Sequence, residues 1–148
     1  AKIPEVTAVH LPHGGCGFYA AVVQVRNPRR GSAREVIHET FRAFRSLQRV
    51  VVVDADVDLF DAVDVDWAIT TRFDADAGLV VLPREEGHIL NPVVRINPDG
   101  KGGTVTKIGI DATVPHGADR AKFERVAFKR VDLARYDIRA ARAPRAKR

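Results

Sequence analysis

Hydrophobic and polar positions alternate along the chain in patterns that predict strands and helices in turn. Residues 6–11 and 18–26 are rich in strand-forming side chains, and the glycines between them favour an antiparallel pair. Residues 49–54, RVVVVD, are apolar without alternation, which is typical of a strand covered on both faces. We expect another buried strand at residues 79–83, LVVLP, and a final one at residues 104–113, TVTKIGIDAT.

Two helices are expected between these strands. Ser32 is followed three residues later by Glu35, which predicts a capping box that opens the first helix. The apolar positions after it recur at helical spacing, and its expected buried face holds Val36, Ile37, Thr40, Phe41, Phe44 and Leu47. A short second helix is expected around residues 64–71. Strand, helix and strand in this order imply a right-handed parallel crossover, so the predicted fold class is α/β, a mixed β-sheet flanked by helices.

The length and the charge distribution divide the chain. With 148 residues and 45% hydrophobic content, one domain with its own core is expected. Residues 1–119 hold 13 Lys and Arg against 16 Asp and Glu, whereas residues 120–148 hold 11 against 3. We therefore predict an α/β domain over residues 1–118 and a basic C-terminal extension over residues 119–148, partly helical or frayed. Such an extension could contact nucleic acid, another subunit or nothing.

The cysteine content and the hydropathy bear on the cellular setting. Cys16 is the only cysteine, which excludes an internal disulfide and a thiol cluster for zinc. No apolar run approaches the roughly 18 residues that a membrane helix needs, and the first ten residues show no signal-peptide pattern. We expect a cytoplasmic protein without a membrane partner.

Three aspartates after the central strand suggest a calcium loop, but the spacing fails. Counted from Asp54, the position that requires glycine holds Leu59 and the position that requires glutamate holds Val65. Helix caps and loop hydrogen bonds account equally well for the carboxylates of Asp54, Asp56 and Asp58. No metal site is predicted in this chain.

The remaining polar residues give no catalytic constellation. Cys16 has no base near it in sequence, and the histidines show no metal-ligand spacing: His10, His13, His38, His88 and His116. A basic stripe recurs every three or four residues, as a phosphate-binding surface would: Arg34, His38, Arg42, Arg45 and Arg49. Amphipathic helices place charge outward in any case, and no aromatic residues interleave for base stacking. Nucleic acid is therefore not an expected partner.

Lys107 lies inside the last predicted strand, next to Gly109 on one side of the pleat, while Ile108 and Ile110 point to the other side. A single lysine in a strand is typical of a solvated outer face. A point charge with a glycine-lined approach also suits a phosphate or a carboxylate. The residues alone leave both interpretations open.

Two longer strings resemble a known family. Residues 53–72 follow the pattern VDxDVDxxDxxDVxWAxxTR, and residues 107–113 follow KxGIDAT. Together with IPEVTAVHLPHGGCGFYAAVVQV near the start, they make the chain similar, from about residue 3 to about residue 113, to the C-terminal third of the UbiD family. Members of that family are decarboxylases that use prenylated flavin mononucleotide.

The resemblance implies a fold, a role and one site residue. In the family this third is an α/β domain used largely for oligomerisation, and the lysine of the KxGIDAT strand reaches the flavin phosphate. Lys107 matches that lysine, and Asp111 is expected to hold the end of the strand and its loop. The family segments that hold the prenylated FMN, Mn²⁺, K⁺ and a Glu-Arg-Glu catalytic set are absent here. The chain is not expected to be catalytic alone.

Two origins are compatible with the resemblance. We favour a separate small subunit of a split (de)carboxylase of aromatic or α,β-unsaturated acids, with a larger catalytic subunit as its partner in a homo- or hetero-oligomer. The other origin is a fragment of a full-length enzyme. A third possibility is a non-enzymatic α/β binding or scaffold module that meets nucleic acid or an acidic partner through its basic extension. The turn GHILNP also departs from the Ser- and Asp-rich turn expected of the family.

Overall fold

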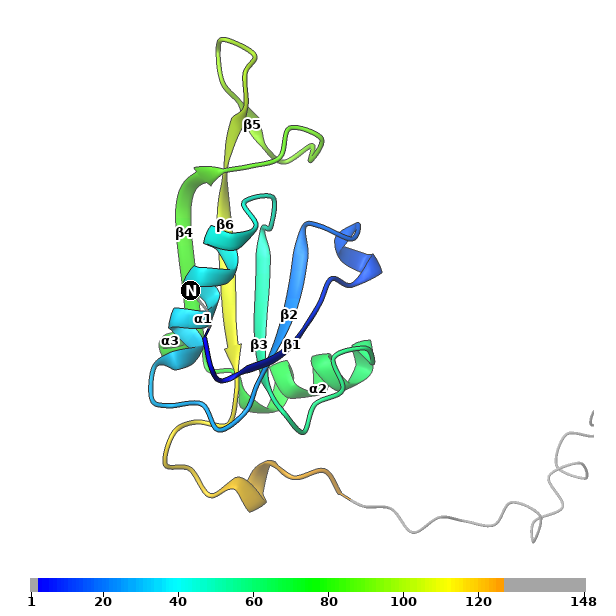
Figure 1. The fold of residues 1–148 in the computed structure, drawn as a ribbon, viewed down its shortest axis with the longest axis vertical. Helices are drawn as coiled ribbons and strands as arrows, with labels where there is room; N and C mark the ends of the chain where they lie inside the picture. The colour runs from blue at the N-terminus through cyan, green and yellow to red at the C-terminus, as the bar shows by residue number, and fades with distance from the viewer. Residues whose placement is uncertain (1–2, 127–148) are drawn as a thin grey trace, which may run out of the picture.

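The computed structural model describes residues 3–126, which form a six-stranded mixed sheet in the order β1-β2-β3-β6-β4, with β5 paired to β6 (Figure 1). Strands β2, β3 and β6 are parallel, and β1 and β4 are antiparallel strands at the two edges. The strand bounds are β1 Val6–His10, β2 Ala20–Val25, β3 Arg49–Asp54, β4 Leu79–Glu86, β5 Arg95–Ile96 and β6 Gly103–Ala112. The mixed α/β fold class is confirmed.

The helices cover the two faces of this sheet unequally. Helix α1 joins β2 to the parallel strand β3, which confirms the predicted crossover, and lies along one face, whereas α2 packs near one end of the other (Figure 1). The helices and 3₁₀ turns are η1 His13–Gly15, α1 Ser32–Ala43, α2 Ala62–Arg72, α3 Ala75–Gly78 and η2 Arg120–Phe123. No helix within residues 3–126 is long and apolar enough to cross a membrane.

The central strand β3 supplies both cores, as its continuous valines predicted. Val50 and Val52 pack under α1, while Val51 and Val53 face the opposite way, toward α2. Burying each such side chain contributes about 1.5–3 kcal/mol before the entropy of ordering the chain is counted. The sheet is therefore held between two apolar layers along much of β3.

Gly109 permits the close contact between β6 and α1. A Cβ atom at this position would lie 2.2 Å from Cγ2 of Ile37, well inside any real contact distance. The open, glycine-lined approach to Lys107 that the sequence suggested is therefore filled by Ile37. The glycine serves helix–sheet packing.

The start and the end of α1 differ from the prediction. Gly31, with a left-handed φ of 80°, is the N-cap residue, and no side chain caps the helix. Ser32 is instead the first helical residue, and its buried hydroxyl has no hydrogen-bond partner among residues 3–126, so the capping box is wrong. The helix ends at Ala43, which leaves Phe44 in an extended conformation and 39% exposed. Leu47 is buried as expected, but from the loop.

Strand β4 is not the buried strand that its apolar sequence suggested. It lies at the edge of the sheet, and after Val80 its side chains are largely exposed. Its last residues continue beyond the body of the sheet and, with β5 and the start of β6, form a projecting arm over residues 85–103 (Figure 1). Most of the basic extension lies outside the described residues, so its conformation stays a prediction.

Candidate functional site

Lys107 lies under α1 and not on a solvated face. Its side chain belongs to the α1 side of β6 and is 2% exposed, so the solvent-facing interpretation is wrong. The ammonium Nζ donates a hydrogen bond to the carbonyl oxygen of Arg45 at 2.5 Å and lies 5.5 Å from the ring centroid of Phe41. Strand alternation predicted that Lys107 and Ile108 point to opposite sides, but it did not reveal that the helix covers the side of Lys107.

Burial lowers the pKa of the Lys107 ammonium, against the charges of Glu85 and Glu86, which raise it. An ammonium has three N–H donors, and the carbonyl of Arg45 is its acceptor among the described residues. Two donors stay unused within residues 3–126, but Arg45 and Phe41 cover Nζ, so a phosphate could reach it only if this cover moved. In this closed arrangement, Lys107 does not fit a phosphate ligand.

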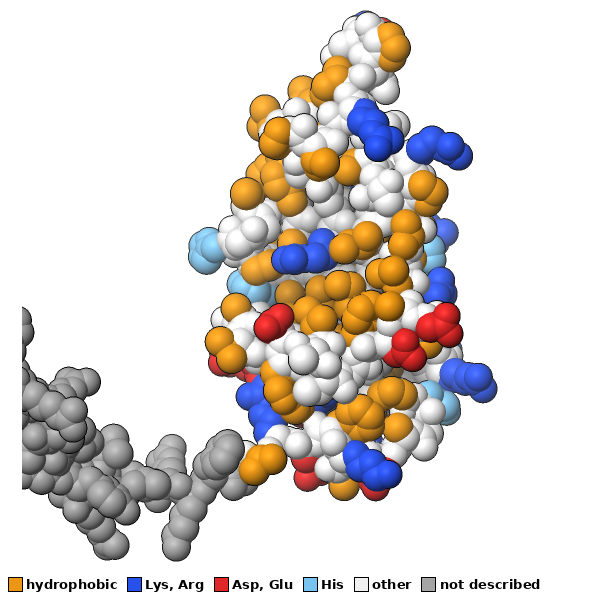
Figure 2. Space-filling model, turned by 180° about the vertical axis from the view of Figure 1, so that it is seen from behind, with side chains coloured by type: hydrophobic (Ala, Val, Ile, Leu, Met, Phe, Trp, Pro, Cys, Tyr) orange, Lys and Arg blue, Asp and Glu red, His pale blue; other side chains and the backbone are white. Residues whose placement is uncertain are grey.

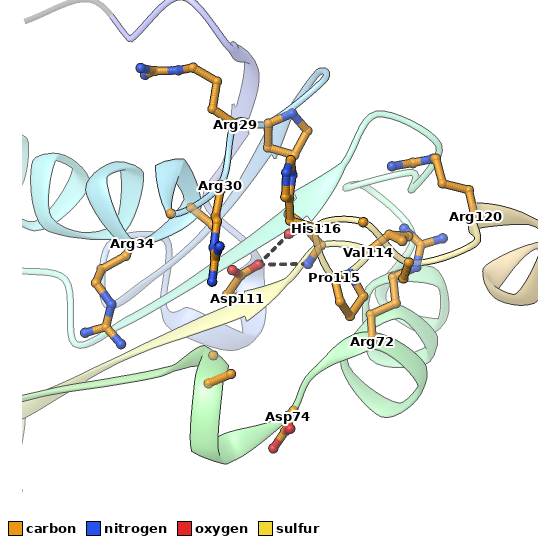
Figure 3. Close-up of a pocket in the computed structure, with 18 of the residues that line it drawn as sticks. Arg29, Arg30, Arg34, Arg72, Asp74, Asp111, Val114, Pro115, His116 and Arg120 are labelled. Atoms are coloured by element: carbon orange, nitrogen blue, oxygen red, sulfur yellow. Dashed lines mark hydrogen bonds between the residues drawn. The ribbon is translucent and has the colours of Figure 1, made fainter.

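Asp111 lies four residues further along β6 and stabilises the end of the strand and its loop, as predicted. Its Oδ1 accepts hydrogen bonds from the backbone N–H of Thr113 at 3.0 Å and from the Thr113 hydroxyl at 2.7 Å (Figure 3). Four residues separate Asp111 from Lys107, which corresponds to about 13 Å along a strand. The structure therefore does not bring these two residues into one site.

A cavity of about 460 Å³ opens at the carboxyl ends of the parallel strands, beside Asp111. Ligands of α/β proteins commonly bind at this end of a sheet. Its walls come from the loop at residues 27–31, the first turn of α1, α3 and the segment at residues 113–118 (Figure 3). The charged lining residues are Arg29, Arg30, Arg34, Arg72, Arg120, Asp74 and Asp111, with His116 beside them.

A buried ion network lies beneath this cavity. The Arg72 side chain, 1% exposed, donates from Nη1 to Asp54 Oδ2 at 3.1 Å and from Nη2 to Asp56 Oδ2 at 2.6 Å. Asp54 also accepts the backbone N–H of Val114 at 2.6 Å and the guanidinium of Arg120 at 3.4 Å. The hydrogen bond from Arg72 holds the pKa of the Asp56 carboxyl below its usual range. This network ties the ends of β3 and α2 to the chain that follows β6.

The network explains the aspartates that suggested a calcium loop. Asp54 and Asp56 neutralise Arg72, and Asp58 accepts the backbone N–H of Phe60 at 2.9 Å. Within residues 3–126, no group of three or more His, Cys, Asp or Glu side chains is arranged to hold a metal ion. Among the described residues, the arginines of the cavity wall include some that form ion pairs and some that do not, and Asp74 and Asp111 add two carboxylates. This mixture of charges does not favour one class of ligand.

Within residues 3–126, no histidine or cysteine side chain takes part in the hydrogen bonds of this network, although His116 lines the cavity above it. His10 stacks against Phe60 with ring centroids 4.7 Å apart, and His88 meets Phe18 at 5.2 Å. Cys16 is exposed and has a left-handed φ of 53°. The sequence reasoning missed Arg72, because an arginine in the last turn of a helix ordinarily points to solvent near the helix dipole. Its place in the TR end of the longer motif was the available signal.

Comparison with known proteins confirms the family resemblance. Residues 1–112 match the family model for the C-terminal domain of 3-octaprenyl-4-hydroxybenzoate carboxy-lyase, UbiD. The protein in the cooM 5′ region of Rhodospirillum rubrum is 43% identical over 137 residues, which cover 93% of this chain and 28% of that protein. Anhydromevalonate phosphate decarboxylase from Aeropyrum pernix is 42% identical over 113 residues, covering 76% of this chain and 24% of the relative.

Solved structures agree with the sequence comparison. The UbiD-class enzyme HmfF from Pelotomaculum thermopropionicum, in complex with FMN, superposes with a TM-score of 0.77 at 32% identity, covering 90% of this chain and 29% of HmfF. An evolved dimeric form of HmfF, in complex with prFMN, gives a TM-score of 0.66 at 29% identity, covering 90% of this chain and 26% of that form. The chain thus spans less than a third of the length of these relatives. It belongs to the UbiD family of decarboxylases, in which it corresponds to the C-terminal domain.

Proposed function

We propose that this chain is the C-terminal-domain subunit of a UbiD-type, prenylated-FMN-dependent (de)carboxylase and works with a larger catalytic subunit. The observation that carries the proposal is the match of residues 1–112 to the UbiD C-terminal domain, a domain that the relatives carry together with a much longer remainder. The named relatives are a decarboxylase and an enzyme solved with FMN and with prFMN. The proposed substrates are aromatic or α,β-unsaturated acids.

Within such an assembly the chain supplies structure, and the partner supplies the chemistry. The cofactor, when bound, would stabilise the carbanion character that develops as carbon dioxide leaves. The larger subunit would hold the cofactor together with Mn²⁺ and K⁺. This chain would contribute a sheet whose strand ends are fixed by the Arg72 network and whose outer surface meets the partner. Because its single thiol fits a reducing compartment, we place the assembly in the cytoplasm.

Lys107 is the proposed contact of this chain with the flavin phosphate. The contact requires the segment at residues 44–48 to move in the assembled complex, so that a phosphate oxygen replaces the Arg45 carbonyl as acceptor. A charge-assisted hydrogen bond of this kind contributes roughly 1.5–3 kcal/mol. Lys107→Ala should therefore raise the dissociation constant for flavin by at least about tenfold, which lowers the occupancy of the complex at limiting flavin. Lys101→Ala, at an exposed lysine on the arm, is the matched control, and equal occupancy in both variants would remove Lys107 from the site.

The assembly itself is tested by purifying the tagged chain from its native host. The proposal predicts a co-purifying larger UbiD-type protein, identified by peptide mass, together with the absorbance of a bound flavin. A colourless chain that is recovered alone, or as a self-associated species, would contradict the proposal.

A further inference from the structure

A second groove, of about 340 Å³, lies where the arm joins the sheet. It is lined by Gln48, Arg49, Val93, Arg95, Thr104, Val105, Thr106 and Ile108. The groove opens on the face of the sheet opposite α1, because Ile108 and Arg49 are register partners on neighbouring strands and share that face. It is separate from the cavity beside Asp111 and from Lys107. The side chains of Asp111 and Lys107 both lie on the α1 side of β6.

An uncovered apolar surface continues from this groove in two directions. Across the sheet, Val81 is the register partner of Ile108, and the two side chains are 50% and 36% exposed. Along the arm, Ile89, Leu90 and Val93 are each more than half exposed. Figure 2 shows hydrophobic side chains spread over this face from its middle to the projecting end, with basic side chains among them. Soluble proteins rarely leave apolar patches of this extent without a partner.

The groove presents side-chain donors that lack a partner among the described residues. Arg49 and Arg95 are exposed, and neither forms an ion pair within residues 3–126. The buried amide nitrogen Nε2 of Gln48 has no hydrogen-bond partner in the same part of the chain. No aspartate or glutamate is present among the described residues that line the groove. An occupant with carboxylate oxygens would satisfy these donors, and an apolar body would cover Ile108 and Val93.

We propose that the groove, the row of Val81 and Ile108 and the apolar side of the arm form the docking surface for the larger catalytic subunit. The occupant would be a segment of that subunit with apolar side chains flanked by Asp or Glu. This inference rests on the proposed function and names the surface through which it operates. In each relative, more than two thirds of the protein lies outside the matched region yet shares one chain with it, so a large neighbour is available to cover this face.

Two other occupants fit less well. A small acidic molecule would fill the groove but leave the row at Val81 and the tip of the arm uncovered. A second copy could offer Phe60 and Val63, which are strongly exposed beside Asp61. The Asp61 carboxylate, however, already accepts the N–H of Val63 as the N-cap of α2, so it is a poorer partner for the arginines of the groove.

The test uses the chain co-expressed with its co-purified larger subunit, with the dissociation constant measured by interferometry. Ile108→Asp places a carboxylate on the groove floor, and the double variant R49E/R95E reverses its charge. Each should weaken binding by about 30-fold, which is the scale of an interface hot spot. Val63→Asp, an equally drastic change at an exposed valine on α2, should stay within about twofold of the wild type.

Three outcomes separate the ideas. Wild-type affinity in both groove variants, with a larger subunit still bound, would overturn the docking surface and leave the proposed function intact. A loss caused by Val63→Asp, or self-association that the groove variants abolish, would assign the surface to a second copy. A wild-type chain that binds no larger subunit would overturn the proposed function as well. A photo-crosslinking residue at Val93 provides an independent readout should Ile108→Asp fold poorly, and the inference requires it to crosslink to an acidic segment of the larger subunit.

Discussion

Arg72, at the end of α2, and Lys107, in β6, are both buried cations, but their surroundings differ. Arg72, at the carboxyl ends of the parallel strands, meets the carboxylates of Asp54 and Asp56. Lys107, in the middle of β6, meets a backbone carbonyl and the face of Phe41, and burial lowers its pKa. The pKa of Arg72 is instead raised, because its two carboxylate partners outweigh the opposing effect of burial.

The difference shows what each residue contributes to the free energy of folding. Removing one partner of a buried ion pair leaves an uncompensated charge, which is strongly destabilising. Replacing a buried cation that has no carboxylate partner by an apolar side chain instead removes the cost of taking that charge out of water. Arg72 is thus a structural residue that this chain needs on its own. Because burial lowers the pKa of Lys107, keeping this side chain charged costs free energy in the folded chain.

The largest effect is expected at the paired cation. Asp54→Ala should lower the free energy of unfolding by about 3 kcal/mol or more, since it removes one of the two carboxylate partners of Arg72 and also the acceptor of the Val114 N–H. Urea denaturation followed by circular dichroism measures this. Asp66→Ala, at an exposed aspartate of α2, should change stability by less than about 0.5 kcal/mol. Equal losses in both variants would show that the network carries no special share of the stability.

Next in size is the contact that covers Lys107. Gly109→Ala forces a Cβ against Ile37 and should cost about 1–3 kcal/mol of unfolding free energy. Gly14→Ala is the matched control, because no atom lies within 4 Å of a Cβ placed there. Adding Ile37→Val should relieve part of the loss in a double-mutant cycle. A purely additive cycle would mean that the two residues do not press on each other.

A smaller effect is expected at the unpaired cation. Lys107→Met keeps the aliphatic stem and removes the charge, so the unfolding free energy should stay within about 1 kcal/mol of the wild type or rise. The unfolding free energy of Arg72→Met should be several kcal/mol below that of the wild type under the same conditions. A large loss in Lys107→Met would mean that the hydrogen bond to Arg45 stabilises the chain and that the contrast between the two cations is wrong.

The smallest effect is expected in the pH dependence of the unfolding free energy. Because the pKa of Lys107 in the folded chain lies below its ordinary value of 10.5, the folded state releases this proton before the unfolded state does. Stability should therefore rise with pH between the lowered pKa and 10.5, by at most about 1.4 kcal/mol per pH unit. The difference between wild type and Lys107→Met in urea titrations across this window isolates the effect. A difference that does not change with pH would contradict the lowered pKa.

The sequence predicted the fold better than it predicted the environment of single charges. The valine run of β3 and the β2-α1-β3 crossover follow from the spacing of apolar residues. The exposure of β4 does not follow from this spacing, because the apolar string LVVLP is compatible with an edge strand as well as with a central strand. Strand parity placed Lys107 opposite Ile108, but it could not tell which face α1 covers. The partners of Arg72 lie 16 and 18 residues earlier, in the same motif, but the apolar spacing does not show that the end of β3 and the end of α2 meet.

The central claim is that this chain functions as one subunit of a larger flavin-dependent decarboxylase. Native mass spectrometry of the complex purified from the host tests it most directly, since it reports every bound chain and cofactor by mass. We predict a hetero-oligomer that contains this 16.3 kDa chain, a larger UbiD-type subunit and a prenylated flavin. A homo-oligomer of this chain without flavin or a larger subunit would contradict the account.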